Sequence, residues 1–193
     1  VTSIKYYAFC ECSSFQKIVI PKGVTSIENA LFEFCSNLQS ITIPEKLISI
    51  GENAFNNCTC LQNITIPKSV TSIGIGAFRK CSNLKTIAFP EGVTSIENNT
   101  FHSCLQLQSI LIPESITSIG YFAFYSCSKL QSITIPKGVT IIEDSAFQYC
   151  SNIATVTYLG KSNPSYGKSV FASTNLKEIF VTKEYENDDF CGL

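Results

Sequence analysis

Residues 61–83 read LQNITIPKSVTSIGIGAFRKCSN, and this stretch is one unit of a repeat that fills most of the chain. Its fixed point is a phenylalanine, which recurs at a constant step of 23 residues. The equivalent positions are Phe9, Phe32, Phe55, Phe78, Phe101, Phe124 and Phe147. A constant period of this length is typical of architectures in which one supersecondary unit is stacked many times. The sequence therefore predicts a repeat solenoid of about eight units.

Each unit contains two short extended segments and one turn segment. Leu38, Ile41 and Ile43 place apolar residues on one side of a short strand. The proline that follows has no N–H for a strand ladder and ends the strand. Residues 24–27 predict a second extended piece. In 28–37 apolar residues recur at three-residue spacing, which predicts a short helical or 3₁₀ turn.

No single unit can bury its own apolar edge, so consecutive coils must stack. Stacking pairs equivalent strands in parallel at about 4.8 Å per coil. We expect a repeat array over residues 1–159, truncated at its amino end because Val1 and Ile4 match the end of a unit. Residues 160–193 are expected to form a divergent last repeat and a polar C-terminal cap.

Composition excludes several classes of protein. The 193 residues carry 14 Lys plus Arg and 15 Asp plus Glu, and no basic stripe exists that could grip nucleic-acid phosphates. No apolar run approaches the roughly 18 residues of a membrane helix, so direct membrane insertion is not expected. No secretion signal follows Val1, and we expect any signal or anchor to lie outside this sequence.

Cysteine is the most conspicuous candidate for chemistry. Seven units carry it three positions after the phenylalanine: Cys12, Cys35, Cys58, Cys81, Cys104, Cys127 and Cys150. Buried thiols, disulfides between coils and metal ligands are the alternatives. Buried thiols are favoured, because stacked positions have parallel Cβ vectors and zinc needs four convergent ligands. Three cysteines lie outside this column, and Cys10, Cys60 and Cys191 are the candidates for exposed, reactive thiols.

No catalytic arrangement is recognisable. His102 is the only histidine and has no partnered nucleophile, in a column expected to be solvated. The segment 74–76 lacks the third glycine of a dinucleotide loop. The acidic pairs at 143–144 and 188–189 are expected to be solvated surface. We therefore predict no enzyme activity, no cofactor and no metal site.

Binding residues are better motivated, because the outward positions of a stacked strand become a long exposed row. This row is rich in hydroxyl groups and consists of Ser40, Thr42, Asn63, Thr65, Thr86, Ala88, Ser109, Leu111, Ser132 and Thr134. Ala88 and Leu111 interrupt it with an apolar patch that a partner could desolvate at low cost. The alternative is that Ser and Thr are only soluble strand residues.

A second candidate patch is aromatic. Tyr121, Phe122 and Tyr125 lie in one coil, where most other coils have small or polar residues. Clustered exposed aromatic side chains are favoured as interface anchors. The alternative is that these rings pack against the flanking coils.

The unit LxxIxIPxxVxxIxxxAFxxCxx, as in residues 61–83, resembles the BspA-type leucine-rich repeat, a family named for bacterial surface adhesins and also found in parasitic protists. The resemblance covers residues 1–158 and implies a right-handed leucine-rich-repeat coil. It also implies a cell-surface or secreted protein that attaches to host matrix proteins, host cells or other microbes.

The favoured hypothesis is a non-enzymatic adhesion module that contacts a host matrix or cell-surface macromolecule at several coils simultaneously. One alternative is an intracellular protein–protein interaction scaffold that uses the same face. Another is an architectural surface-coat repeat whose recognition elements lie elsewhere, and this alternative predicts that the chain itself binds nothing.

Overall fold

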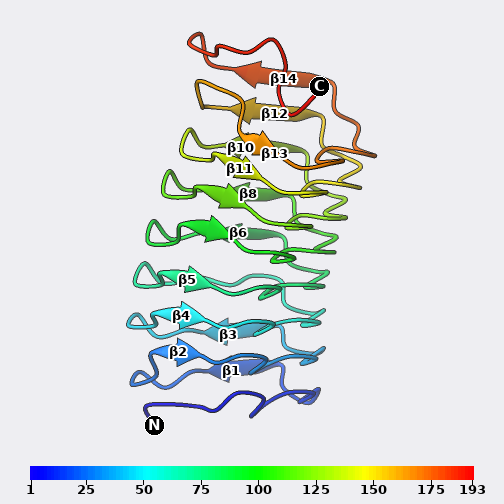
Figure 1. Ribbon diagram of the computed structural model, residues 1–193. Helices are drawn as coiled ribbons and strands as arrows, with labels where there is room; N and C mark the ends of the chain where they lie inside the picture. The colour runs from blue at the N-terminus through cyan, green and yellow to red at the C-terminus, as the bar shows by residue number, and fades with distance from the viewer.

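The computed structural model describes residues 1–193 and is a solenoid of about seven turns of 23 residues, with strands on two opposite faces (Figure 1). The first strand column contains β1 (Lys17–Val19), β3 (Ser40–Thr42), β6 (Thr86–Ala88), β8 (Ser109–Leu111), β10 (Ser132–Ile135), β12 (Thr155–Tyr158) and β14 (Glu178–Val181). The second contains β2 (Ser26–Ile27), β4 (Ser49–Ile50), β5 (Ser72–Ile73), β7 (Ser95–Ile96), β9 (Ser118–Ile119), β11 (Ile141–Ile142) and β13 (Ser165–Tyr166). The predicted repeat solenoid with parallel strands is confirmed.

The register of the strands follows the sequence period. In the first column Lys17 pairs with Ser40, and Thr86 pairs with Ser109. In the second column Ser49 pairs with Ser72. All strand pairs are parallel and join consecutive coils. Because the side-chain period of a strand is two, this register keeps equivalent positions of successive coils on the same face throughout the stack.

Neither strand column is continuous along the stack. The first column is interrupted between β3 and residues 63–66, and again between β8 and β10, whereas the second is interrupted between β5 and β7. At the first two positions the second column remains paired, through β4 with β5 and β9 with β11. At the third position the first column contributes only the bridge between Asn63 and Thr86. The interruptions are therefore staggered.

A proline turn joins the two columns at one edge of each coil. The amide N–H of Val70 donates to the Pro67 carbonyl at 3.1 Å, and Val93 donates to Pro90 at the same distance. These bonds link residues three apart, as in a β-turn. The proline ends the first strand and the turn returns the chain to the second.

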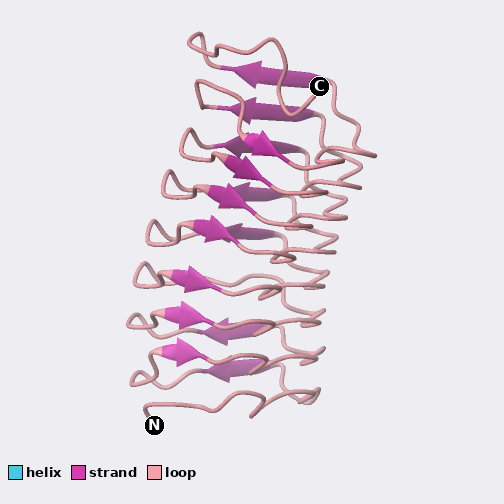
Figure 2. Ribbon diagram, in the orientation of Figure 1, coloured by secondary structure: helices cyan, strands magenta, loops and turns pink.

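The turn segments at the opposite edge are not helical, and the expectation of a short helical or 3₁₀ turn is wrong. The structure contains strands and turns only (Figure 2). Leu31, Glu33 and Cys35 do donate their N–H groups to carbonyls three residues earlier, as a 3₁₀ helix requires. However, Ala30 and Phe34 have positive φ values of 53° and 60°, which reverse the chain.

The N–H groups between those donors explain why a helix cannot form. Ala30, Phe32 and Phe34 donate to the carbonyls of Glu52, Ala54 and Asn56 in the next coil, at 2.8–2.9 Å. Alternate backbone donors thus bond within the turn and between coils. A helix would direct all of them within the segment and would separate the coils.

A ladder of phenylalanine rings forms the centre of the core. The rings of Phe9, Phe32, Phe55, Phe78, Phe101, Phe124, Phe147 and Phe171 stack successively, with centroids 5.1–5.7 Å apart and planes within 17°. Such spacing is typical of offset stacking. Because each ring is covered by the rings of its neighbours, burial of one coil requires the presence of the next.

The cysteine column lies beside this ladder as buried, hydrogen-bonded thiols. The Cys58 thiol donates to the Phe32 carbonyl at 3.1 Å, and the same carbonyl accepts the N–H of Cys35 at 3.1 Å. Equivalent thiol bonds recur in the neighbouring coils. All ten cysteines are free. The column thus contributes small core side chains that also satisfy a backbone carbonyl.

Thiol reactivity tests this placement. Burial raises the pKa of Cys35 to about 11 and the pKa of Cys104 well above its ordinary value. A thiol reagent at about pH 8 should label at most the half-buried Cys10, Cys12 and Cys60 in the native chain, and all ten cysteines after denaturation. Mass spectrometry of the labelled protein counts the modified thiols. Rapid native labelling of any of the six buried column cysteines, from Cys35 to Cys150, would contradict this placement.

Replacement of a ladder ring tests its contribution to stability. Phe78 is fully buried between two other rings, and Phe78→Ala should lower the free energy of unfolding by about 3–5 kcal/mol. Urea titration measures this change. Leu111→Ala is the control, because Leu111 is exposed and its truncation should change the value by about 0.5 kcal/mol or less. Similar effects of the two substitutions would contradict the account.

None of the segments forms a helix with the length and apolarity that crossing a bilayer requires.

Candidate functional site

The first strand column presents the row that the sequence analysis identified. The ten positions that the sequence predicts are all exposed: Ser40, Thr42, Asn63, Thr65, Thr86, Ala88, Ser109, Leu111, Ser132 and Thr134. The alternate residues point inward, and Ile87 and Ile133 are buried. The structure therefore brings these ten residues together on one surface, called here the strand face. No charged residue occurs among them.

An apolar depression lies at the middle of the strand face. Leu111 is 69% exposed and pairs in register with Ala88 on the neighbouring strand. Together with Asn63, Thr65 and Thr86 they line a hollow of about 420 Å³. An exposed leucine at the centre of a neutral hydroxyl surface can be covered without desolvating a charge. The depression is thus the part of the strand face best suited to a macromolecular contact.

Apolar side chains also mark the two ends of this surface, and the sequence period indicates only the first of them. Val19 and Phe180 occupy the position of Leu111 in β1 and β14, and both are exposed. The 23-residue count identifies Val19. Phe180 lies beyond the irregular segment 160–168, where the count is lost, so only the pairing of Thr157 with Phe180 places it in the row.

The aromatic residues predicted as a second patch do not join the strand face. Tyr121, Phe122 and Tyr125 lie in the turn segment that follows β9, at the opposite edge of the coil from the proline turn. Tyr121 and Phe122 are 43% and 37% exposed, whereas Tyr125 is half-buried. The two predicted patches are therefore separate surfaces.

The aromatic patch is larger than the sequence indicated. The ring of Tyr125 stacks on His102 with centroids 4.8 Å apart and contacts Phe122 and Tyr149 edge-on at 5.4 and 5.2 Å. These four residues, with Tyr121, are called here the aromatic edge. The sequence did not indicate His102 and Tyr149 as members of this patch, because they join it through ring contacts between coils. The rings thus pack between coils and are also partly exposed.

Negative charge borders the aromatic edge at Tyr121. The pKa of Tyr121 is raised by the nearby Glu143 carboxylate, which also accepts its hydrogen bond, and by Asp144. The phenol therefore stays neutral and remains a hydrogen-bond donor. It gives the aromatic edge one polar tip among apolar ring surfaces.

His102 is not arranged for catalysis. Its Nδ1 lies 2.9 Å from the Ser103 hydroxyl, but no hydrogen bond joins the ring to a carboxylate that could orient it as a base. The ring is half-buried against Tyr125, so the expectation that its column is solvated is wrong at this coil. The histidine therefore acts as a packing element of the aromatic edge.

The off-column cysteines differ from one another. Cys10 and Cys60 are half-buried, but Cys191 is buried, and the expectation that it is exposed is wrong. The adjacent Phe190 packs on Tyr158 and closes the last coil over this segment. Burial raises the pKa of Cys191 to about 12, and Asp189 acts in the same direction. No three His, Cys, Asp or Glu side chains lie close enough together to hold a metal ion.

The family of the chain follows from its repeats. The sequence matches the BspA type leucine rich repeat region in 6 copies, over residues 2–104 and 77–189. The chain belongs to the BspA-type leucine-rich repeat family. Leucine-rich repeat arrays are typically binding modules rather than enzymes. No curated protein matches the sequence.

Solved structures of other proteins contain a similar solenoid. A leucine-rich repeat protein of T. pallidum is 31% identical with a TM-score of 0.78, over 82% of this chain and 76% of that one. One from Eubacterium ventriosum is 27% identical with a TM-score of 0.75, over 85% of this chain but only 44% of that one. The pneumococcal vaccine antigen PcpA is 20% identical with a TM-score of 0.50 and has the same fold. The alignment covers 92% of this chain and 58% of that one.

The aromatic edge should make the stability of this BspA-type array depend on pH. Burial lowers the pKa of His102, and the Arg79 guanidinium acts in the same direction. The unfolded chain therefore binds the imidazole proton more tightly than the native chain, so the free energy of unfolding falls as pH decreases through about 6.5. Urea titrations at about pH 7.5 and pH 5.5 measure this loss. His102→Gln should reduce it, and an unchanged loss in the variant would contradict the assignment.

Proposed function

We propose that this BspA-type array is a non-enzymatic binding module displayed at the cell surface, where its strand face contacts a host matrix or cell-surface macromolecule. The observation that carries the proposal is the apolar depression formed by Ala88 and Leu111 within a neutral, hydroxyl-rich surface. Family membership supports the surface location, since the family is named for bacterial surface adhesins.

The shape of the strand face favours a macromolecule over a small ligand. The exposed row runs along the solenoid axis from Ser40 to Thr134, and the depression at its middle is lined only by neutral polar and aliphatic side chains. No charged group lines this depression to hold a small polar molecule. A broad partner can cover several coils simultaneously, with Leu111 as the central apolar contact and hydroxyl groups around it.

Repetition of the coils would raise the overall affinity of such a contact. Each coil contributes one or two short polar side chains, which individually form weak contacts. When several coils and several displayed copies bind together, the later contacts form at high effective concentration. A module of this kind needs a rigid array with a regular surface, and the staggered ladders and the phenylalanine stack provide that rigidity.

Substitution of Leu111 tests the proposal. Leu111→Lys places a charge in the apolar depression and should weaken binding to a panel of immobilised extracellular-matrix proteins and epithelial cells by about tenfold or more. Surface plasmon resonance and cell-binding assays measure the affinity. Ile48→Lys is the matched control, because Ile48 is an exposed aliphatic residue that lies beside the second strand column.

Three other outcomes of these binding assays would contradict a contact at the apolar depression. Equal binding by the Leu111→Lys and Ile48→Lys variants would exclude the depression as the contact. If a Tyr121→Ala, Phe122→Ala, Tyr125→Ala variant alone lost binding with its fold intact, the aromatic edge would be the contact surface. Absence of any binding across the panel would favour an intracellular scaffold or an architectural coat repeat. Circular dichroism of each variant confirms that the fold is retained.

A further inference from the structure

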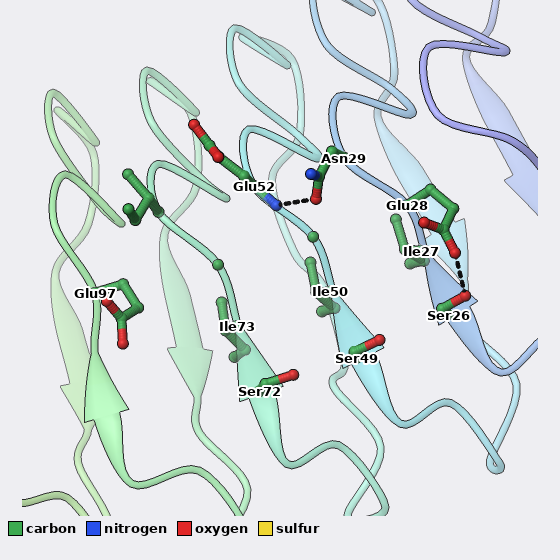
Figure 3. A pocket seen from close by; sticks show the side chains of 13 residues that line it. Ser26, Ile27, Glu28, Asn29, Ser49, Ile50, Glu52, Ser72, Ile73 and Glu97 are labelled. Carbon is green, nitrogen blue, oxygen red and sulfur yellow. Dashed lines mark hydrogen bonds between the residues drawn. The ribbon is translucent and has the colours of Figure 1, made fainter.

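A groove runs over three paired strands of the second strand column, on the face opposite to the strand face, and ends where that column is interrupted. It has a volume of about 470 Å³ and is lined by β2, β4 and β5, by the residues that follow them, and by Glu97 (Figure 3). The strand residues contribute hydroxyl groups to it, because Ser26, Ser49 and Ser72 occupy equivalent positions. None of the residues that line it belongs to the strand face or to the aromatic edge.

Two glycines line this groove between its glutamates. The position after each strand of the second column is occupied in turn by Glu28, Gly51, Gly74 and Glu97. A Cβ atom on Gly51 would lie 2.5 Å from the Asn29 Oδ1 atom, and one on Gly74 would lie 2.6 Å from the backbone nitrogen of Glu52. Close approach of the preceding coil therefore requires glycine at both positions. The groove is the space between the two glutamates, where side chains are missing.

The backbone in this groove has lost part of its ladder. In the second column Gly51 donates to the Ile27 carbonyl and Gly74 to the Ile50 carbonyl, at 2.7 and 2.9 Å. The corresponding bond from Glu97 to the Ile73 carbonyl is absent, because β5 and β7 do not pair. A peptide that follows the groove would therefore run along the solenoid axis, across three paired strands, as far as Glu97.

The charge of the groove selects among such peptides. Glu28 and Glu97 are held by hydrogen bonds from Ser26 at 2.6 Å and Ser95 at 2.5 Å, and Glu52 is exposed beside them. No Lys or Arg lines the groove, and the one salt bridge of the chain lies elsewhere, between Lys161 and Glu184. The carboxylates are too dispersed to share a metal ion. They can instead accept separate cationic groups.

We propose that this groove binds an extended basic segment of a partner protein, with one Lys or Arg at Glu28 and another at Glu97. The two glutamates are three coils apart, which corresponds to about 14 Å at 4.8 Å per coil. An extended peptide rises about 3.4 Å per residue, so basic residues four positions apart match this spacing. This groove shares no residue with the strand face, so a negative result for one proposed site leaves the other proposal unaffected.

Fluorescence anisotropy with labelled hexalysine tests the proposal. Saturable binding of one peptide per chain is expected, with weaker binding as salt concentration rises. The double variant Glu28→Gln, Glu97→Gln keeps side chains that accept the serine hydrogen bonds but removes both charges, and should weaken binding by about tenfold. The matched control is Glu114→Gln, Glu178→Gln, which makes the same change in net charge at two exposed residues outside the groove.

A steric variant provides a second arm. Ser72→Tyr fills the groove from an exposed strand position and should abolish hexalysine binding, whereas Ser118→Tyr, at the equivalent position of β9, should not. Equal weakening by the two glutamate pairs would overturn the proposal and indicate non-specific attraction. So would absence of saturable binding, or binding of spermine as tight as that of hexalysine, which would assign the groove to small polyamines.

Discussion

The structure depends on the division of backbone hydrogen-bond donors between the turn and the neighbouring coil. In the turn segments one N–H bonds three residues back and the next bonds to the adjacent coil, as for Leu31 and Phe32. This alternation fixes the rise per coil at a distance that also stacks the phenylalanine rings, and it holds the cysteine thiols against the carbonyls of the preceding coil. This alternation favours a constant period of 23 residues. An inserted residue would direct to the next coil the N–H groups that bond within the turn, and the reverse. The strand ladders can be interrupted because the hydrogen bonds between turn segments continue through every coil.

Those interruptions connect the fold to its candidate binding surfaces. The groove over β2, β4 and β5 ends where β5 and β7 do not pair, and it is lined by two glycines that close packing of the coils requires. On the opposite face, the bridge between Asn63 and Thr86 lies at the edge of the apolar depression. The coil junction with the least strand pairing is thus adjacent to both proposed sites. A regular scaffold provides rigidity, and local departures from regularity provide the features that a partner can recognise.

Most of the fold could be predicted from the sequence, because a repeat presents the same evidence many times. The columns of Phe, Cys, Pro and Ile determine the period, the inward faces and the ends of the strands. The turn conformation could not be predicted in this way. The three-residue spacing of Phe32, Cys35 and Leu38 is compatible with a 3₁₀ helix, and only the bonds to the next coil and the positive φ of Ala30 and Phe34 exclude it.

The candidate surfaces were predictable where they depend on strand alternation, as for Thr86 and Leu111, and were missed where they depend on contacts between coils. His102 and Tyr149 join the aromatic edge through neighbours 23 and 24 residues away. The groove depends on how successive coils of the second column stack, which no single residue type indicates. The most direct test of the central claim is hydrogen–deuterium exchange on the chain bound to a matrix protein that it recognises. Selective protection of residues 86–88 and 109–111 is the predicted result, and protection confined to residues 120–126 would contradict it.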